Sequence, residues 1–255
     1  MRTPLVAGNW KMHGHLSANA DLLTALVSCA DLQTKALEVL VCPPSIYLAQ
    51  AHSLLAASAI QLGAQNFHPQ NQGAFTGEIA APMLQEFGVS YALVGHSERR
   101  SLFAEDDTFL LAKCQAALSA RITPILCVGE SLEEYEKGQG LEVVRAQVTS
   151  VVRALNPEEV QSLVIAYEPV WAIGTGLTAT PEYAQQVHAE IRDQVAHWSE
   201  PSIAQQLRIL YGGSVKPENA AALFAMPDVD GALVGGASLD AASFIAICQA
   251  AAHTS

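Results

Sequence analysis

Short apolar runs alternate along the chain with longer segments in which apolar residues recur at helical spacing. Eight of these runs are rich in valine, leucine and isoleucine, and most are continuously apolar rather than alternating with polar residues. They cover residues 5–10, 38–42, 60–64, 91–94, 123–128, 163–167, 207–211 and 231–234. Continuous apolar strands are typical of a parallel sheet that is covered on both faces. The pattern therefore predicts eight buried parallel strands.

The segments between and after these runs predict eight helices, over residues 17–30, 45–57, 80–87, 107–120, 132–155, 181–198, 217–224 and 241–252. Ser45 and Thr180 are predicted N-caps, Pro181 suits a first helical position, and Pro217 stands with Glu218 in another first turn. Eight strand-helix units of about 32 residues each predict a single closed (β/α)8 barrel over residues 1–255. The alternative is an open doubly wound sheet. No composition shift or linker divides the chain.

Composition agrees with one large core, because half of the 255 residues are hydrophobic and only 15% are charged. The formal net charge of -12 argues against nucleic acid or an anionic membrane as a partner, since both require clustered lysine and arginine. An anionic substrate would have to be held locally, by a lysine, backbone amides and helix N-termini.

The five cysteines are odd in number and widely spaced, unlike a disulfide framework or a CxxC metal site. The N-terminus has no charged leader, and no stretch reaches membrane-spanning length. These features favour a cytoplasmic protein in a reducing compartment.

In a barrel of this kind the active site is built where the strands end and the following loops begin. The strand ends carry, in order, residues 9–11 (NWK), 42–44 (CPP), 65–66 (QN), 95–98 (GHSE), 129–130 (GE), 168–169 (EP), 212–214 (GGS) and 235–236 (GG). A carboxylate, an imidazole, an ammonium group and two double-glycine turns are therefore expected to face one pocket.

The two double-glycine turns follow strands seven and eight, where such barrels often bind phosphate. Glycine lets backbone amides approach an oxyanion closely, and a following helix adds a favourable dipole. The alternative is two ordinary tight turns. Lys11, at the first strand end, is a candidate counter-ion for the phosphate, although most lysines are simply solvated.

His96 precedes the polar run Ser97–Glu98–Arg99–Arg100, which is typical of the start of a helix. A helix N-terminus would keep the imidazole neutral, so that it donates a hydrogen bond to a carbonyl oxygen. The alternative is a histidine that merely bonds a loop. The four polar residues are interpreted as a capping and ion-pair cluster, and the two arginines in particular as structural.

Glu168 ends an apolar strand, where a carboxylate is costly and apolar surroundings raise its basicity. It precedes the apolar loop 169–176 (PVWAIGTG), which has proline at one end and glycines at the other. One interpretation is a loop packed permanently against the barrel. The other is a lid that lays Ile173 and Trp171 over a ligand and excludes water.

Seven segments in order resemble the triosephosphate isomerase family: 8–12 (GNWKM), 73–78 (GAFTGE), 94–100 (VGHSERR), 127–130 (CVGE), 167–176 (YEPVWAIGTG), 211–216 (YGGSVK) and 234–236 (VGG). The resemblance implies interconversion of dihydroxyacetone phosphate and glyceraldehyde 3-phosphate, a step of glycolysis and gluconeogenesis, with no metal or organic cofactor. It implies that Glu168 removes a carbon-bound proton. It also implies that neutral His96 polarises the carbonyl and that Asn9 and Lys11 contact the substrate and stabilise the enediolate. The roles of Glu168 and His96 are known properties of the family.

The resemblance further implies a phosphate cradle from the amides of Gly174, Ser214, Gly235 and Gly236. It makes residues 169–176 the lid, with Pro169, Trp171, Ile173 and Gly176 as its main residues, and pairs Ile173 with Leu233 as an apolar clamp over Glu168. The family forms homodimers, in which the loop 73–78 would carry Thr76 toward the partner's site. Ala74 and Phe75 on that loop suit burial better than solvent.

The chain departs from the family pattern at three places: His13 replaces a frequent asparagine, Leu177 a frequent lysine after the lid, and Tyr135 a common arginine. None touches the expected chemistry, but Leu177 could alter the motion of the lid. Two other functions stay open: another phosphate-binding barrel, and a sugar-phosphate sensor or inactive homologue. The first lacks this combination of His96, Glu168 and lid, and the second predicts the loss of a catalytic residue, which is not seen.

Overall fold

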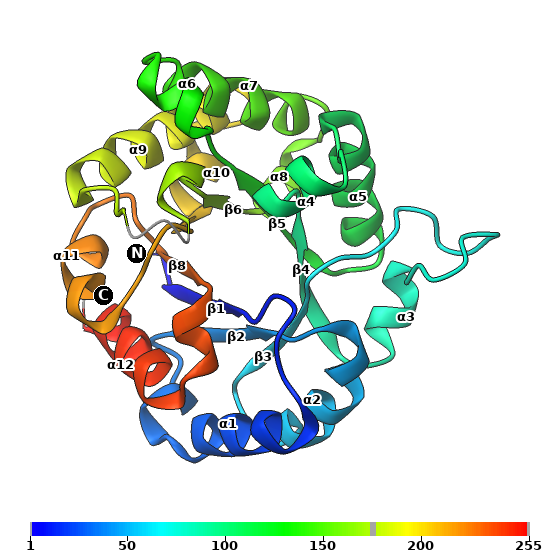
Figure 1. Cartoon of the computed structure of the whole chain (residues 1–255). Coiled ribbons are helices and arrows are strands. Elements are labelled where there is room, and N and C mark those ends of the chain that lie inside the picture. Colours follow the sequence, from blue (N-terminus) through cyan, green and yellow to red (C-terminus); the bar gives the residue numbers. More distant parts are fainter. Residues whose placement is uncertain (1, 174–176, 254–255) are drawn as a thin grey trace.

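The computed structural model describes residues 2–173 and 177–253. Eight parallel strands pair in chain order and close into a barrel, with the last strand against the first (Figure 1). The strands are β1 (Leu5–Asn9), β2 (Glu38–Cys42), β3 (Gln61–Ala64), β4 (Val89–Val94), β5 (Thr123–Val128), β6 (Val164–Tyr167), β7 (Arg208–Tyr211) and β8 (Gly231–Val234). The predicted (β/α)8 barrel is confirmed, and the open sheet is excluded because β1 and β8 pair over four residues.

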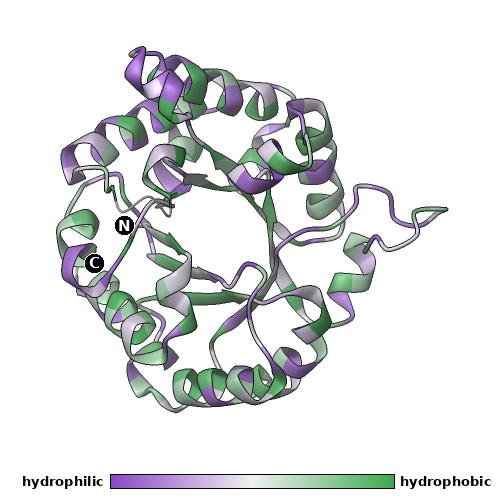
Figure 2. Cartoon of the chain, in the orientation of Figure 1, coloured by the Kyte–Doolittle hydropathy of each residue, from purple (hydrophilic) through white to green (hydrophobic). Residues whose placement is uncertain are grey.

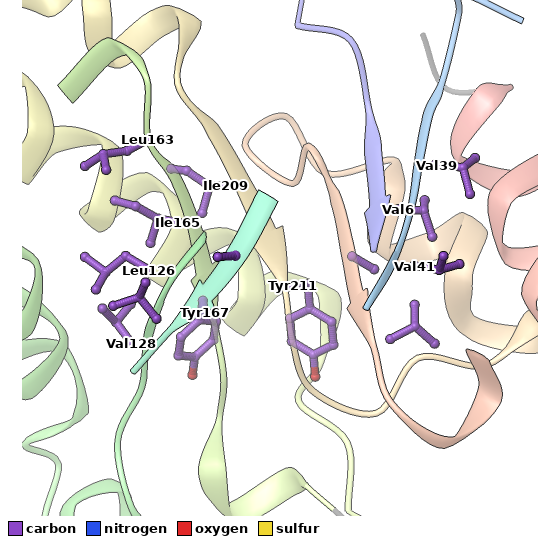
Figure 3. Close-up of a cluster of buried hydrophobic side chains, with 14 of the residues drawn as sticks. Val6, Val39, Val41, Leu126, Val128, Leu163, Ile165, Tyr167, Ile209 and Tyr211 are labelled. Carbon is purple, nitrogen blue, oxygen red and sulfur yellow. The ribbon is translucent and has the colours of Figure 1, made fainter. Parts of the chain in front are cut away.

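The strands bury side chains on both faces, which explains their continuous apolar character. Leu5 and Ala7 of β1 belong to a cluster that fills the barrel, whereas Val6 between them belongs to the layer under the helices. Figure 3 shows part of this outer layer, with Tyr167 and Tyr211 side by side. Figure 2 shows the strands mostly hydrophobic and the helices of mixed character.

The helices surround the barrel: α1 (Leu16–Ser28), α2 (Leu48–Leu55), α3 (Ala81–Gln85), α4 (Ser97–Leu102), α5 (Asp107–Ser119), α6 (Leu132–Glu136), α7 (Gly140–Val152), α8 (Pro157–Gln161), α9 (Pro181–Trp198), α10 (Pro201–Gln206), α11 (Pro217–Phe224) and α12 (Ala241–Ala252). Short 3-10 helices are η1 (Ala30–Gln33), η2 (Ser45–Tyr47), η3 (Val170–Ala172) and η4 (Gly236–Leu239). The predicted cap at Thr180 is confirmed, since its hydroxyl accepts the Tyr183 N–H at 3.2 Å. Pro181 and Pro217 open their helices as expected.

Two local predictions are wrong. Ser45 is not an N-cap: it is the first residue of η2, and no side chain caps that helix. The single helix expected over residues 132–155 is divided into α6 and α7. The division falls at Gly138, which has a φ of 70°, the left-handed conformation that commonly ends a helix.

The loop between β3 and α3 projects away from the barrel, as the cyan segment in Figure 1 shows. Residues 71–78 of this loop are all exposed. Within residues 2–173 and 177–253, none of the helices combines the length and apolar character that crossing a membrane requires.

Candidate active site

A cavity of about 310 Å³ lies at the carboxyl ends of the strands. It brings together the first, fourth, sixth, seventh and eighth strand ends, as the strand-end pattern predicts. Its lining consists of Asn9, Lys11, His96, Glu168, Ile173, Gly212, Gly213, Ser214, Val215, Lys216, Leu233, Gly235, Gly236 and Ala237. The parallel register of the barrel explains this convergence, because all strand ends of one sense meet at one rim.

Glu168 directly follows β6 and is 2% exposed. Its Oε1 lies 2.9 Å from His96 Nε2, and its Oε2 accepts the backbone N–H of Ser97 at 3.0 Å. Gly212 lies against it: a Cβ added there would stand 2.9 Å from Glu168 Cγ. The glycine at the end of β7 therefore makes room for the carboxylate.

His96 is buried and acts as the N-cap of α4, where its Nδ1 accepts the backbone N–H of Glu98 at 3.2 Å. Because Nδ1 accepts, the proton of a neutral imidazole is on Nε2, which points at Glu168. Burial lowers the pKa of His96, but the charge and hydrogen bond of Glu168 outweigh it, so the pKa is raised. The helix-start position expected for His96 is confirmed, and it fixes the tautomer.

Lys11 adopts a left-handed backbone conformation with a φ of 52°, which is strained for a residue with a side chain. The conformation is held by neighbours: Asn9 Oδ1 accepts the Lys11 N–H at 3.0 Å, and Gln65 Nε2 donates to the Lys11 carbonyl at 2.9 Å. Strain that the surroundings maintain at a cavity wall is a feature of functional sites.

The ammonium group of Lys11 pairs with Glu98, at 2.6 Å between Nζ and Oε1. Burial raises the pKa of Glu98, but Lys11 and His96 outweigh it, and the pKa is lowered. Sequence reasoning grouped Glu98 with a capping cluster and missed this contact. Its place two residues after His96, on the same strand-end loop, was the available signal.

The two neighbouring arginines are structural, as interpreted. Arg99 pairs with Glu105 at 2.6 Å and Arg100 with Asp107 at 2.8 Å.

The double-glycine turns line the cavity together with Ser214. A Cβ on Gly235 would come within 3.6 Å of Lys11 Cε, so this turn adjoins the lysine. Helix α11 begins at Pro217, as predicted, and η4 begins at Gly236. Gly174 and Gly176 lie outside the described residues.

The apolar loop after Glu168 places its residues on two different sides. Ile173 and Leu233 line the cavity, and the clamp expected of them stays a prediction. Trp171 does not line it: the indole is only 8% exposed and its Nε1 donates to Glu130 Oε1 at 2.7 Å. The expectation that Trp171 covers a ligand stays a prediction; in this structure its N–H has a buried acceptor in Glu130.

Glu130 is a buried carboxylate to which sequence reasoning gave no role. Its Oε1 also accepts from Tyr167 Oη at 2.9 Å and Tyr183 Oη at 3.3 Å. Burial raises its pKa, and the hydrogen bonds from Trp171, Tyr167 and Tyr183 offset this only in part. Its position at the end of β5, within the strand-end pattern, was the signal that could have found it.

The described residues contain no group of three or more histidine, cysteine, aspartate or glutamate side chains that could hold a metal ion. Cys127 is fully buried beside Glu168; burial and that carboxylate raise the pKa of its thiol, which makes it a poor nucleophile. Thr76, on the projecting loop, is exposed and does not line the cavity of its own chain.

Comparison with known proteins agrees with this geometry. The family model described as triosephosphate isomerase matches residues 4–251. The protein named triosephosphate isomerase from Thiobacillus denitrificans is 54% identical over 252 residues, covering 99% of this chain and 100% of the relative. Those of the same name from Dechloromonas aromatica and Methylococcus capsulatus are 53% and 50% identical, over 251 and 249 residues. These cover 98% of this chain and 100% and 98% of the relatives. The chain therefore belongs to the triosephosphate isomerase family.

Proposed function

We propose that the chain interconverts dihydroxyacetone phosphate and glyceraldehyde 3-phosphate through an enediolate, with Glu168 as the base. As an intramolecular oxidoreductase of this family it serves glycolysis and gluconeogenesis. The observation that carries the assignment is the joint placement of Glu168, His96 and Lys11 on one small cavity beside two glycine turns.

The hydrogen bonds define what each group does. The Nε2 proton of His96 now faces Glu168. A substrate carbonyl oxygen would replace Glu168 as the acceptor of this Nε2–H hydrogen bond. Glu168 would then be free to remove a proton from the adjacent carbon. The electron pair of the C–H bond becomes the C=C bond of the enediolate, while the carbonyl electron pair moves onto oxygen. The hydroxyl proton passes from the neighbouring oxygen to this one, which regenerates a C=O bond there, and Glu168 returns the carbon-bound proton to the neighbouring carbon.

Charge at the developing enediolate is stabilised by His96, Asn9 and Lys11. Lys11 is shared with Glu98, so it is not a free cation. We infer that the phosphate is held largely by the backbone amides of Ser214, Gly235 and Gly236, completed by Gly174. This cradle suits a protein of net charge -12, whose overall field opposes an anion.

We infer that the segment from Pro169 to Gly176 works as a lid, with Ile173 and Leu233 as the apolar clamp over Glu168. Both side chains line the cavity in the described part of the chain. Exclusion of water matters because an enediol phosphate in water eliminates phosphate instead of returning as product.

We further propose that residues 1–255 form one catalytic domain and that two copies associate in the cytoplasm. The support is the exposure of apolar side chains near the projecting loop, including Phe75 at 44% and Phe103 at 63%. In such a dimer Thr76 would approach the partner's cavity. Light scattering at several concentrations tests this arrangement, and a monomer at every concentration would contradict it.

A coupled assay with glyceraldehyde 3-phosphate tests the reaction itself. Turnover is expected to survive a metal chelator, since no cofactor takes part in the proposed steps. Absence of turnover by the purified chain would favour a sugar-phosphate sensor and refute the proposal.

A further inference from the structure

Tyr135 lies flat against the indole of Trp171, with ring centroids 4.3 Å apart and an angle of 24° between the planes. Tyr183 meets both rings from α9, edge-on to Tyr135 at 5.5 Å and to Trp171 at 6.2 Å. The three rings form a cluster on the side of the loop that faces away from the cavity.

The cluster packs against the segment that immediately follows Glu168. Trp171 lies in η3, three positions after Glu168, and is held at its nitrogen by Glu130 Oε1 at 2.7 Å. The backbone N–H of Val170 donates to the Glu130 carbonyl at 3.1 Å. Two hydrogen bonds therefore fix the edge of the indole and the adjoining backbone, but neither fixes the face of the ring.

Tyr135 packs against the face of the indole. Tyr135 stands on α6, a helix of five residues that is anchored at its start by a capping box between Ser131 and Glu134. The phenol ring is 39% exposed, so it covers the indole from the solvent side. Aromatic pairs in this offset geometry contribute attraction beyond the area that they bury.

We propose that Tyr135 is a positioning residue for the isomerase reaction, whose ring stack on Trp171 sets where the chain leaves Glu168 and where Ile173 comes to cover the substrate. This inference rests on the proposed function. Tyr135 does not line the cavity, so its effect on the site is transmitted through the rings that it contacts. The stack is uncharged, so its contribution does not depend on ionic strength.

The test compares three variants of the full-length chain. Tyr135→Leu removes the stack, Tyr135→Phe keeps the ring and removes only the hydroxyl, and Leu132→Ala truncates an exposed apolar residue of the same helix. Each is assayed for kcat, for KM and for the fraction of turnovers that release inorganic phosphate. In that side reaction the C–O bond of the enediolate breaks, phosphate leaves with the electron pair, and dihydroxyacetone phosphate becomes methylglyoxal plus phosphate.

A second readout follows the indole directly. The chain has three tryptophans, and labelling with 5-fluorotryptophan gives each a ¹⁹F resonance that a Trp→Phe variant can assign. The ring current of Tyr135 contributes to the Trp171 shift at a centroid distance of 4.3 Å.

Tyr135→Leu is expected to shift the Trp171 resonance, to lower kcat/KM by roughly 2- to 10-fold and to raise phosphate release by a similar factor. Tyr135→Phe and Leu132→Ala should match the unmodified chain in all three. Unchanged kcat/KM and phosphate release in Tyr135→Leu would overturn the inference even if the Trp171 resonance shifts, as would an equal loss in Leu132→Ala. Failure of the unmodified chain to isomerise would refute the proposed function instead, and the ¹⁹F shift would still report the stack.

Discussion

Replacing Glu168 by glutamine is the most direct perturbation of the proposed base. Both carboxylate oxygens of Glu168 accept hydrogen bonds, Oε1 facing His96 Nε2 at 2.9 Å and Oε2 accepting the Ser97 N–H at 3.0 Å. Glutamine has the same shape but only one acceptor oxygen. With Nδ1 of His96 already accepting from Glu98, the imidazole cannot turn into an acceptor without losing that bond.

Two magnitudes follow. Loss of a general base lowers kcat by ~10² to 10⁴, equivalent to about 3 to 5 kcal/mol. In Glu168→Gln either His96 Nε2–H or the Ser97 N–H would face the new side-chain NH2 group instead of an acceptor. One such unsatisfied donor costs roughly 1 to 3 kcal/mol of stability, which lowers Tm by roughly 2 to 12 °C for a chain of this size.

The assay measures kcat in the coupled reaction and binding by the shift in Tm with glycerol 3-phosphate, which carries the phosphate but no carbonyl. Glu168→Gln should retain that shift while kcat falls. Glu86→Gln, at an exposed carboxylate, is the control and should leave both unchanged. A near-normal kcat in Glu168→Gln would refute Glu168 as the base, and loss of the ligand-induced shift would mean that the site had collapsed instead.

Three further changes test other parts of the structure. Lys11→Met removes the ammonium group next to the glycine turn and should raise KM strongly or abolish turnover in the coupled assay. Burial lowers the pKa of His188 to about 4 from 6.5. Below pH 6.5 the unfolded state therefore binds a proton that the folded state does not bind, and the unfolding free energy should fall by about 2 kcal/mol from pH 7 to pH 5. Arg192→Met removes a buried guanidinium from Asp228, at 2.6 Å, and Asp230, at 2.9 Å, and should cost about 3 to 5 kcal/mol in urea unfolding at pH 7.

Each of these has its own control. Lys35→Met, at an exposed lysine, should leave kinetics unchanged, and normal KM and kcat in Lys11→Met would remove Lys11 from the site. In His188→Phe the fall in unfolding free energy from pH 7 to pH 5 should be smaller by about 2 kcal/mol. An identical pH profile would show that other groups cause the fall. Arg153→Met, at an exposed arginine, should stay within about 0.5 kcal/mol of the unmodified chain, and an equally small effect of Arg192→Met would show that the buried pair is dispensable.

The strand order and the membership of the cavity could be read from the sequence because both depend on local features. Apolar runs mark the strands, and parallel strands in a barrel send their carboxyl ends to one rim. Asn9, His96, Glu168 and the two glycine turns all follow such runs, and all line the cavity. The helix limits were less predictable, as the division at Gly138 shows, because a helical period alone does not reveal a left-handed residue.

The sequence by itself determined which chemical groups follow the strands, and parallel strands bring such groups to one edge of the sheet. Only the tertiary structure decided how they pair. The Lys11 ammonium group takes Glu98 as its partner, and the indole of Trp171 turns from the cavity to Glu130. Side-chain directions of this kind depend on which donor finds an acceptor within about 3 Å, and that distance is set by elements far apart in the chain.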